Sequence, residues 1–240
     1  MIWGNQKRNK IKAAPNKKAM CPLCKGELIP KCGKIMIWHW AHKSNKDCDD
    51  WYEPESVWHK DWKDNFPKEC QEVTIGKHRA DIKIGELIVE LQNTPLSADK
   101  IQERENFYGN MVWILNGRAL GNGLNLKKKK IQINKQSQLN GNPMEKTGRM
   151  KEITTFRWKH PPKSWWVANK PIFIDFSDIQ EESGRWIKPN DYMGYEGYYK
   201  HERDYMKRDI LEIKKIYKKI PCAGWGILIK KKGLLNGFKI

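Results

Sequence analysis

Four of the six cysteines of this chain lie within its first 50 residues, and this crowding constrains the fold more than any other feature of the sequence. Cys21 and Cys24 form a C-x2-C pair, a spacing that places two thiolates within reach of one metal ion. A segment this short buries too little apolar surface to fold on its core alone. We therefore expect residues 1–50 to form a zinc-ribbon-like module that holds structural Zn²⁺ through four of five candidate ligands. These candidates are Cys21, Cys24, His39, His42 and Cys48.

A β-hairpin is expected to bring the second half of this ligand set to the first. Glu27–Ile29 and Ile35–Trp40 have strand character, and the turn between them contains Cys32, the least favoured ligand. The N-terminus has basic residues but lacks the apolar segment of a signal peptide, which favours the cytoplasm and metal thiolates over disulfides. The alternative is that two cysteines and two histidines lie near one another without sharing a metal.

The charge of the chain is strongly positive and unevenly distributed. Lys and Arg number 46 against 28 Asp and Glu, a formal net charge of +18. Residues 1–50 carry 11 basic and 4 acidic side chains, residues 51–110 carry 8 and 12, and residues 111–240 carry 27 and 12. Basic flanks around an acidic centre indicate a nucleic-acid partner and a local cation site, unless the lysine excess only keeps the protein in solution. No apolar run approaches the roughly 18 residues that a membrane span needs, so no membrane partner is expected.

The segment around Gly85 predicts a β-hairpin with a two-residue turn that begins at this glycine. The resulting register places Asp81 opposite Glu90, with Gln92 on the same face, and gathers every apolar residue except Ile88 on the other face. Two carboxylates directly across a strand pair repel each other, and a divalent cation with oxygen ligands would offset that repulsion. The alternative is a solvated face on which both acids lie in water.

A helix is expected to begin after Pro54 and to end at Pro67. Glu55, His59 and Lys63 recur at four-residue intervals and form a polar stripe beside an aromatic one. Packing of the aromatic stripe on the sheet would turn the polar stripe towards the end of the sheet, unless the Glu-His-Lys ladder is simply exposed. The elements expected after this helix are strands over Glu69–Ile75, His78–Ile84 and Leu87–Gln92, a helix capped by Ser97 and a strand over Met111–Leu115.

The motifs in this order resemble a known family. The stretches that carry the resemblance over residues 11–118 are CPLC, HWAH and CD, then ES-x-WHKDWK, HRADI and VELQNT, then ER-x2-FYGNMVWILNG. FRWKHPPKSWW and PIFIDF look like a later segment of the same family. The chain is similar to the PD-(D/E)xK nuclease superfamily and, more narrowly, to the competence protein CoiA family with its phage-borne relatives. This resemblance implies an α+β fold with an αβββαβ nuclease core.

The resemblance also implies roles for side chains of the core. It assigns the metal-binding acids to Asp81 and Glu90, which would hold Mg²⁺ or Mn²⁺, and it makes Glu55 the helix-borne acid. The motif lysine of the superfamily falls at Gln92, which can orient a water but cannot supply a positive charge. A basic residue of the helix stripe would then project into the vacated space, or catalysis would be weak or lost, and we favour the first. The catalytic candidates are Glu55, His59, Lys63, Asp81, Glu90 and Gln92.

The remainder of the sequence is less regular. We expect four regions, which are the zinc-binding module 1–50, the nuclease-like core 51–118, an Asn/Gly/Lys-rich loop or linker over residues 119–150 and a C-terminal α/β extension over residues 151–240. The elements expected in the extension are strands over Ile153–Lys159, Ile172–Phe176 and Gly224–Ile229 and a basic helix over residues 198–220.

Three functions fit these expectations. The first is a divalent-metal-dependent DNA nuclease that acts in DNA uptake, recombination or phage DNA metabolism. The second is a DNA-binding adaptor with a degenerate nuclease fold that does not cleave, and the glutamine at the motif-lysine position is its main support. The third is a lysine-rich RNA-binding protein. Metal-dependent cleavage separates the first from the second, and competition between DNA and RNA separates the third.

Overall fold

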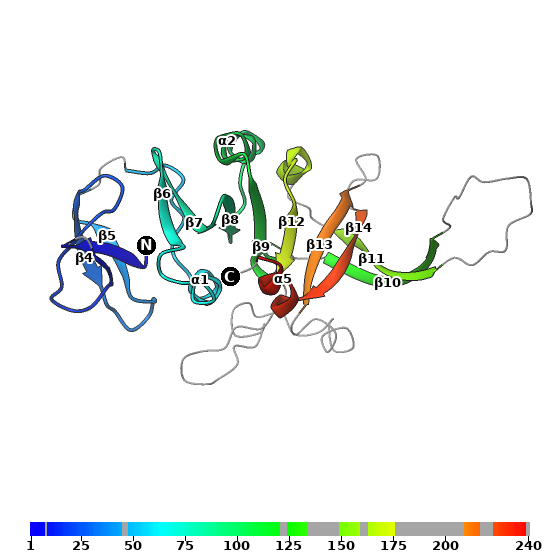
Figure 1. The fold of residues 1–240 in the computed structure, drawn as a ribbon, viewed down its shortest axis with the longest axis horizontal. Helices are drawn as coiled ribbons and strands as arrows, with labels where there is room; N and C mark the ends of the chain where they lie inside the picture. The colour runs from blue at the N-terminus through cyan, green and yellow to red at the C-terminus, as the bar shows by residue number, and fades with distance from the viewer. Residues whose placement is uncertain are drawn as a thin grey trace, which may run out of the picture.

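The computed structural model describes residues 1–7, 9–44, 48–120, 124–133, 149–158, 163–175, 209–216 and 223–238. These residues form a mixed α+β protein with one five-stranded and one nine-stranded β-sheet (Figure 1). No helix in the described stretches is long and apolar enough to cross a lipid bilayer.

The five-stranded sheet forms the N-terminal module and is antiparallel, with strand order β2-β1-β3-β4-β5. Its strands are β1 (Trp3–Gln6), β2 (Asn9–Lys12), β3 (Ala19–Met20), β4 (Glu27–Lys31) and β5 (His39–His42). The expected hairpin is present, because β4 pairs with β5 and places Leu28 opposite His42, but its second strand begins at His39 and not at Ile35. The buried apolar core of the module consists of Met1, Ala13, Ala19, Cys21, Leu28 and Trp40. A core this small needs further support, as the sequence predicts.

The nine-stranded sheet has the strand order β10-β11-β14-β13-β12-β9-β8-β7-β6 (Figure 1). The elements of its N-terminal half are α1 (Val57–Lys63), β6 (Gln71–Ile75), β7 (His78–Ile84), β8 (Leu87–Gln92), α2 (Ala98–Tyr108) and β9 (Met111–Asn116). Strands β6, β7 and β8 form an antiparallel meander, and β9 lies parallel to β8 after the α2 crossover. The αβββαβ order expected from the sequence is therefore confirmed.

The β7–β8 hairpin has the register that the sequence predicts. Ile82 pairs with Val89, and Gly85 begins the turn at a φ of +55°, where an L side chain would be strained. Ile82 and Val89 belong to the core cluster that contains the aromatic residues of α1, whereas Ile88 packs with Ala80 in the cluster on the other face. The hairpin thus separates two apolar layers, and its register fixes which side chains reach each layer.

The large sheet continues into the C-terminal half of the chain. Strand β12 pairs in parallel with β9, and β13, β14, β11 and β10 follow as antiparallel neighbours. The bounds of these elements are α3 (Gly117–Leu120), β10 (Leu124–Ile133), β11 (Arg149–Trp158), the 3-10 helix η1 (Lys163–Val167), β12 (Ile172–Asp175), β13 (Asp209–Ile216), β14 (Ala223–Lys230) and α5 (Lys231–Gly237).

Two expectations for this half are wrong, and three are confirmed. Residues 124–133 form β10 instead of a loop, because all ten positions pair with β11 and gain a strand partner despite the run of lysines. Residues 209–216 form β13 instead of part of a basic helix, because β12 and β14 flank this isoleucine-rich segment on both sides. The rest of these two expected segments, including residues 134–148 and 198–208, lies outside the described residues. The strands expected at β11, β12 and β14 are present.

Helix α1 is fixed at its start and along its buried face. The hydroxyl of Ser56 accepts a hydrogen bond from the His59 backbone N–H at 3.3 Å, and the Ser56 N–H donates to His59 Nδ1 at 3.3 Å, which together form a capping box. Trp58 and Trp62 are buried, and both indole N–H groups donate to one oxygen of Asp175, at 2.9 and 2.7 Å. The aromatic stripe therefore packs on the sheet, as expected, and the polar stripe faces the β7–β8 hairpin.

Candidate functional site

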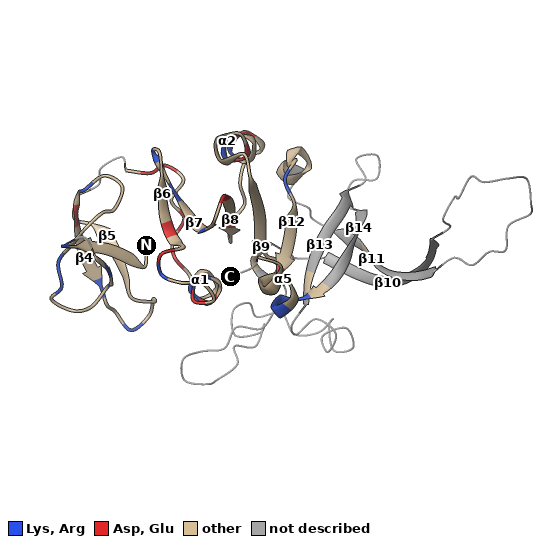
Figure 2. Ribbon diagram, viewed as in Figure 1, with Lys and Arg blue, Asp and Glu red and all other residues tan. Residues whose placement is uncertain are grey.

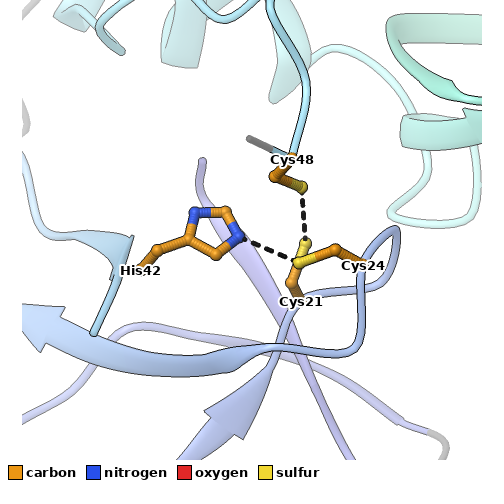
Figure 3. A group of neighbouring side chains, drawn as sticks. All are labelled: Cys21, Cys24, His42 and Cys48. Atoms are coloured by element: carbon orange, nitrogen blue, oxygen red, sulfur yellow. Dashed lines mark hydrogen bonds between the residues drawn. The ribbon is translucent and has the colours of Figure 1, made fainter. Parts of the chain in front are cut away.

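Four of the five candidate zinc ligands meet at one point of the N-terminal module (Figure 3). The ligand atoms of Cys21, Cys24, His42 and Cys48 all lie within 4.8 Å of one another. Cys21 Sγ lies 3.6 Å from Cys48 Sγ, and Cys24 Sγ lies 3.4 Å from His42 Nε2. Three thiols and one imidazole are a donor set that Zn²⁺ prefers in tetrahedral structural sites. The cluster could therefore hold a structural metal ion.

A tight loop after β3 delivers the first two ligands. The Cys21 N–H donates to the Gly26 carbonyl at 2.8 Å, and the Lys25 N–H donates to the Cys21 carbonyl at 3.1 Å. The Gly26 N–H then donates to Cys24 Sγ at 3.4 Å. Burial and the neighbouring thiols raise the pKa of Cys48 to about 12. The Cys48 thiol therefore keeps its proton at neutral pH, and a bound metal ion would displace that proton.

The fifth candidate, His39, lies outside the cluster. Its Nδ1 lies 2.9 Å from the carbonyl oxygen of Ile37, and Cys32 is also outside the cluster. His39 and His42 are three residues apart on β5, so their side chains point to opposite faces of the strand. This alternation was a signal in the sequence that only one of the two histidines could face the C-x2-C pair.

A polar pocket lies beside the β7–β8 hairpin, next to the N-terminal module, and Lys63 occupies its centre. Lys63 is 2% exposed, and its Nζ lies 2.9 and 3.0 Å from the two oxygens of Glu55, 3.0 Å from Asp81 Oδ1 and 3.1 Å from Glu72 Oε1. Although burial disfavours its charge, the carboxylates of Asp81, Glu55 and Glu72 raise the pKa of Lys63 well above its usual value. The pocket therefore contains a permanent positive charge surrounded by three acids.

Asp81 and Glu90 lie next to each other, as the hairpin register predicts. The Asp81 N–H donates to Glu90 Oε1 at 3.2 Å, and the Leu91 N–H donates to Asp81 Oδ2 at 3.0 Å. Each acid also has a cation of its own, because Lys63 contacts Asp81 and Arg104 NH1 lies 3.2 Å from Glu90 Oε2. Burial and the charge of Asp81 raise the pKa of Glu90 to about 8. The solvated-face alternative is thus wrong for Glu90, which is 4% exposed, and internal cations offset part of the expected repulsion.

Glu55 does not join Asp81 and Glu90 at a single point. Within the described stretches, the groups of three or more ligand atoms that lie within 4.8 Å of one another do not contain these three acids. Glu55 instead gives both carboxylate oxygens to Lys63, and burial raises its pKa. Glu55 precedes the N-cap Ser56 and lies outside α1, so the expectations of a helix from Pro54 and of a helix-borne acid are wrong, because the capping box at Ser56 starts the helix at Val57. Asp81 and Glu90 lie beside each other on the hairpin, and their oxygens could bind a cation.

The last two candidates have different partners. His59 lines the pocket, and its Nε2 lies 3.4 Å from Glu53 Oε2. Although burial disfavours the imidazolium, the hydrogen bond to Glu53 raises the pKa of His59. Gln92 is buried but does not line the pocket, and its Nε2 donates to the Thr94 carbonyl at 2.8 Å. Lys63, and not Gln92, therefore places its polar end beside the acids.

Glu72 is a further partner of Lys63 that the sequence does not reveal, although it does not itself line the pocket. Its Oε1 accepts a hydrogen bond from the Ile2 N–H at 2.8 Å and its Oε2 accepts one from the Trp3 N–H at 3.0 Å. These partners are about 70 residues away in the sequence, so no local pattern marks the contact. The one available signal was the order of β6 and β7, because a regular pairing of these strands would bring Glu72 opposite Asp81.

The segment that follows Cys48 closes the pocket on the module side. Asp49 Oδ1 lies 2.9 Å from His78 Nδ1, and Asp49 Oδ2 accepts a hydrogen bond from the Arg79 N–H at 3.0 Å. Trp51 stacks on the His78 ring with a centroid distance of 3.3 Å. One short segment therefore runs from the Cys/His cluster to β7 and the acidic pocket.

The comparisons with known proteins concern the N-terminal part of the chain. Residues 3–50 match the family model of the competence protein CoiA, N-terminal domain. The N-terminal part of this chain is CoiA-like. Competence protein CoiA of Bacillus subtilis (strain 168) is 42% identical over 62 residues, which are 26% of this chain and 16% of that relative. No solved structure matches the chain significantly.

The match confirms the family resemblance for the CoiA-like N-terminal module. This module carries Cys21, Cys24, His42 and Cys48, so the candidate metal cluster lies within the matched residues 3–50. The acidic pocket around Lys63 is built mainly from residues beyond position 50. Its nuclease assignment stays a prediction from the motifs and the geometry.

Proposed function

We propose that this chain is a divalent-metal-dependent DNA nuclease that hydrolyses phosphodiester bonds in DNA uptake, recombination or phage DNA metabolism. The observation that carries the proposal is the buried ammonium of Lys63 beside the hairpin acids Asp81 and Glu90. Hydrolysis of a phosphodiester needs oxygen ligands for a metal ion and a fixed positive charge near the phosphate. In support of the proposal, the pocket contains the two acids to which the PD-(D/E)xK resemblance assigns the metal, and it contains an ammonium from Lys63 instead of from position 92.

The residues of the pocket have distinct roles in this proposal. Asp81 and Glu90 supply the oxygen ligands for Mg²⁺ or Mn²⁺, which when bound would polarise the phosphate and acidify a water. The raised pKa of Glu90 supports this fit, because a buried acid beside a second acid favours an added cation. Lys63 holds positive charge next to the scissile phosphate, and His59 accepts or donates the proton.

The substitution at Gln92 is compatible with this arrangement. Gln92 donates to Thr94 and shapes the chain after β8, so it does not compete for the centre of the pocket. Lys63 lies on α1, and its ammonium reaches Asp81 from this helix and not from β8, the strand that carries Gln92. We therefore assign the role of the motif lysine to Lys63.

A second candidate function is a DNA-binding adaptor that does not cleave. The observation that favours it is the saturation of Lys63, whose ammonium already contacts Glu55, Glu72 and Asp81. A pocket neutralised by its own ion pairs can serve stability alone. In that case the CoiA-like module, with a structural Zn²⁺, and the basic surface would bind DNA without a reaction.

Cleavage assays with matched variants test the proposal. Supercoiled plasmid and single-stranded DNA are incubated with Mg²⁺, Mn²⁺ or EDTA and with wild type, Asp81→Asn or Glu90→Gln. We expect metal-dependent cleavage that each substitution slows by about 100-fold or more. Glu86→Gln is the control, because Glu86 lies in the turn of the same hairpin with its side chain 90% exposed. Cleavage retained by Asp81→Asn would overturn the site, and DNA binding by an inactive wild type would favour the adaptor.

The salt dependence of binding tests the nucleic-acid partner. Lys and Arg lie on several loops of the N-terminal module, and acidic residues lie on β6 and α1 (Figure 2). If about 6–10 phosphates are contacted, affinity falls about 10³–10⁵-fold between 50 and 200 mM salt. A flat salt dependence would mean that the basic residues only solvate the surface. Tighter binding of RNA than of DNA in competition would favour the RNA-binding alternative.

A further inference from the structure

Glu72 lies between the first strand of the N-terminal module and the acidic pocket. One carboxylate accepts the N–H groups of Ile2 and Trp3 at 2.8 and 3.0 Å and also contacts Lys63 Nζ at 3.1 Å. Glu72 is 1% exposed, so water does not compete for these bonds. In Figure 1 the N-terminus lies close to β6, the edge strand that carries this residue. A single buried side chain therefore joins β1 to the central ammonium of the pocket.

The backbone at Glu72 departs from a regular strand. Its φ is +47°, a region that residues with a Cβ rarely adopt and that costs free energy. The β6–β7 pairing runs from Gln71 with Ile82 to Val73 with Ala80, and it is interrupted at the position between them, where Glu72 would face Asp81. The strain occurs where two acids from neighbouring strands reach the same lysine. Such strain persists when surrounding contacts fix it, and it concentrates at functional sites.

The neighbouring residue strengthens the contact between β1 and β6. Gln71 Oε1 accepts a hydrogen bond from the indole N–H of Trp3 at 2.8 Å, and Gln71 Nε2 donates to the Phe66 carbonyl at 2.7 Å. Gln71 is 3% exposed, so this pair of bonds is also buried. Two adjacent side chains of β6 thus hold β1, and one of them also holds the segment that follows α1.

We propose that Glu72 is a positioning residue that holds the Lys63 ammonium between Glu55 and Asp81 while β1 of the N-terminal module is docked on β6. Displacement of β1 would leave Glu72 without its two backbone donors and free to turn away from Lys63. The N-terminal module then controls the charge arrangement of the pocket. The catalytic consequence rests on the proposed nuclease function, whereas the coupling between Lys63 and β1 does not.

Amide hydrogen exchange of Ile2 and Trp3, measured by NMR on the full chain, tests the coupling. Glu72→Gln leaves only one oxygen for three donors, so exchange of both amides should rise about tenfold or more. Lys63→Met should also raise it several-fold, although Lys63 contacts neither amide, because the unpaired acids repel one another and push the Glu72 carboxylate away from its two backbone donors. The double variant should exchange no faster than Glu72→Gln alone.

Two matched substitutions serve as controls. Glu69→Gln changes an exposed acid just before β6, and Lys60→Met changes a more exposed lysine on α1, so both should leave the two amides at the wild-type rate. Exchange at the wild-type rate in Lys63→Met would overturn the proposal and reduce Glu72 to a local clamp. If Glu72→Gln does not fold, the comparison of Lys63→Met with Lys60→Met decides the same question.

Cleavage kinetics distinguish a positioning role of Glu72 from a merely structural one. Glu72→Gln should lower kcat with KM unchanged, because Glu72 is buried and does not line the pocket in which the substrate would bind. A change in KM alone would contradict a positioning role. An inactive wild type would end the nuclease proposal, and the exchange experiment would still decide the coupling. Exchange of Ile2 and Trp3 that is indifferent to both Glu72→Gln and Lys63→Met would overturn the coupling itself.

Discussion

The Cys/His cluster of the N-terminal module and the acidic pocket of the core both gather side chains that bind cations, but they differ in what balances their charge. In the cluster, three thiols and His42 lie against one another within 4.8 Å. In the pocket, the ammonium of Lys63 contacts three acids and Arg104 contacts Glu90. The first group could bind an external cation, whereas the second contains cations of its own.

This difference suggests two different roles for a metal ion, a structural one at the Cys/His cluster and a catalytic one in the acidic pocket. The N-terminal module has a small core, so a metal ion bound at its cluster would contribute directly to folding. The acidic pocket belongs to a large sheet with two extensive apolar layers, and Lys63 and Arg104 supply cations to its acids. We therefore expect metal removal to unfold the module and to leave the pocket folded but inactive.

The largest effect is expected from Cys24→Ser. Loss of one of four ligands should remove structural Zn²⁺, whose binding free energy is of the order of 10–16 kcal/mol in small zinc-folded domains, and should unfold most of residues 19–50. Elemental analysis and the NMR signals of Trp40 report metal content and local fold. Cys32→Ser is the control, since this cysteine lies in the module outside the cluster. If carefully purified wild-type protein contains no zinc, the cluster is not a structural zinc site.

A smaller effect is expected from Lys63→Met. Removal of the ammonium leaves three carboxylates around an apolar side chain, which should lower the free energy of unfolding by about 3–5 kcal/mol in EDTA. Chemical denaturation measures this loss, and Mn²⁺ should restore part of it. Lys60→Met should cost much less, because Lys60 pairs with Asp64 nearer the surface. A loss below about 1 kcal/mol for Lys63→Met would mean that the internal cation does not hold the pocket together.

The smallest effect is a pH dependence at Glu90. Burial and Asp81 raise its pKa from 4.5 to about 8, so the folded state binds more protons than the unfolded state between these values. The contribution of this group to stability is therefore lost as pH rises from about 5 to 8. In EDTA, Glu90→Gln should flatten the dependence of Tm on pH. The difference in Tm between this variant and wild type should shift in favour of the variant by at least about 2–4 °C from pH 5 to pH 8. If the Tm of the variant and that of wild type change with pH in parallel, the pKa of Glu90 is not raised and the prediction is wrong.

The sequence predicts those parts of the fold that depend on local signals. The bounds of β7 and β8 and their register follow from alternating apolar residues around Gly85. The start of α2 follows from the N-cap Ser97, whose hydroxyl accepts a hydrogen bond from the Lys100 N–H. The C-x2-C pair likewise predicts a metal-binding cluster, but it does not show which other residues complete the ligand set. Each of these signals lies within a few residues of the structure that it predicts.

The remainder depends on contacts between distant segments. Glu72 gains its role from β1, about 70 residues earlier, and from an unusual backbone angle that no composition reveals. Strand β10 forms because β11 supplies a partner along its whole length, which overrides a lysine-rich sequence. The sequence left Lys63 and His59 as equal candidates, and only the tertiary arrangement places the ammonium of Lys63 against Asp81.

The most direct test of the nuclease proposal is anomalous diffraction from crystals of the full chain grown with Mn²⁺ and a short DNA oligonucleotide. The account predicts a zinc peak at Cys21, Cys24, His42 and Cys48. It also predicts a manganese peak within about 2.0–2.6 Å of carboxylate oxygens of both Asp81 and Glu90, with Lys63 Nζ directed at a phosphate. Zinc in the cluster without manganese at the two acids, with Lys63 still bound by Glu55, Glu72 and Asp81, would contradict the nuclease and leave the adaptor.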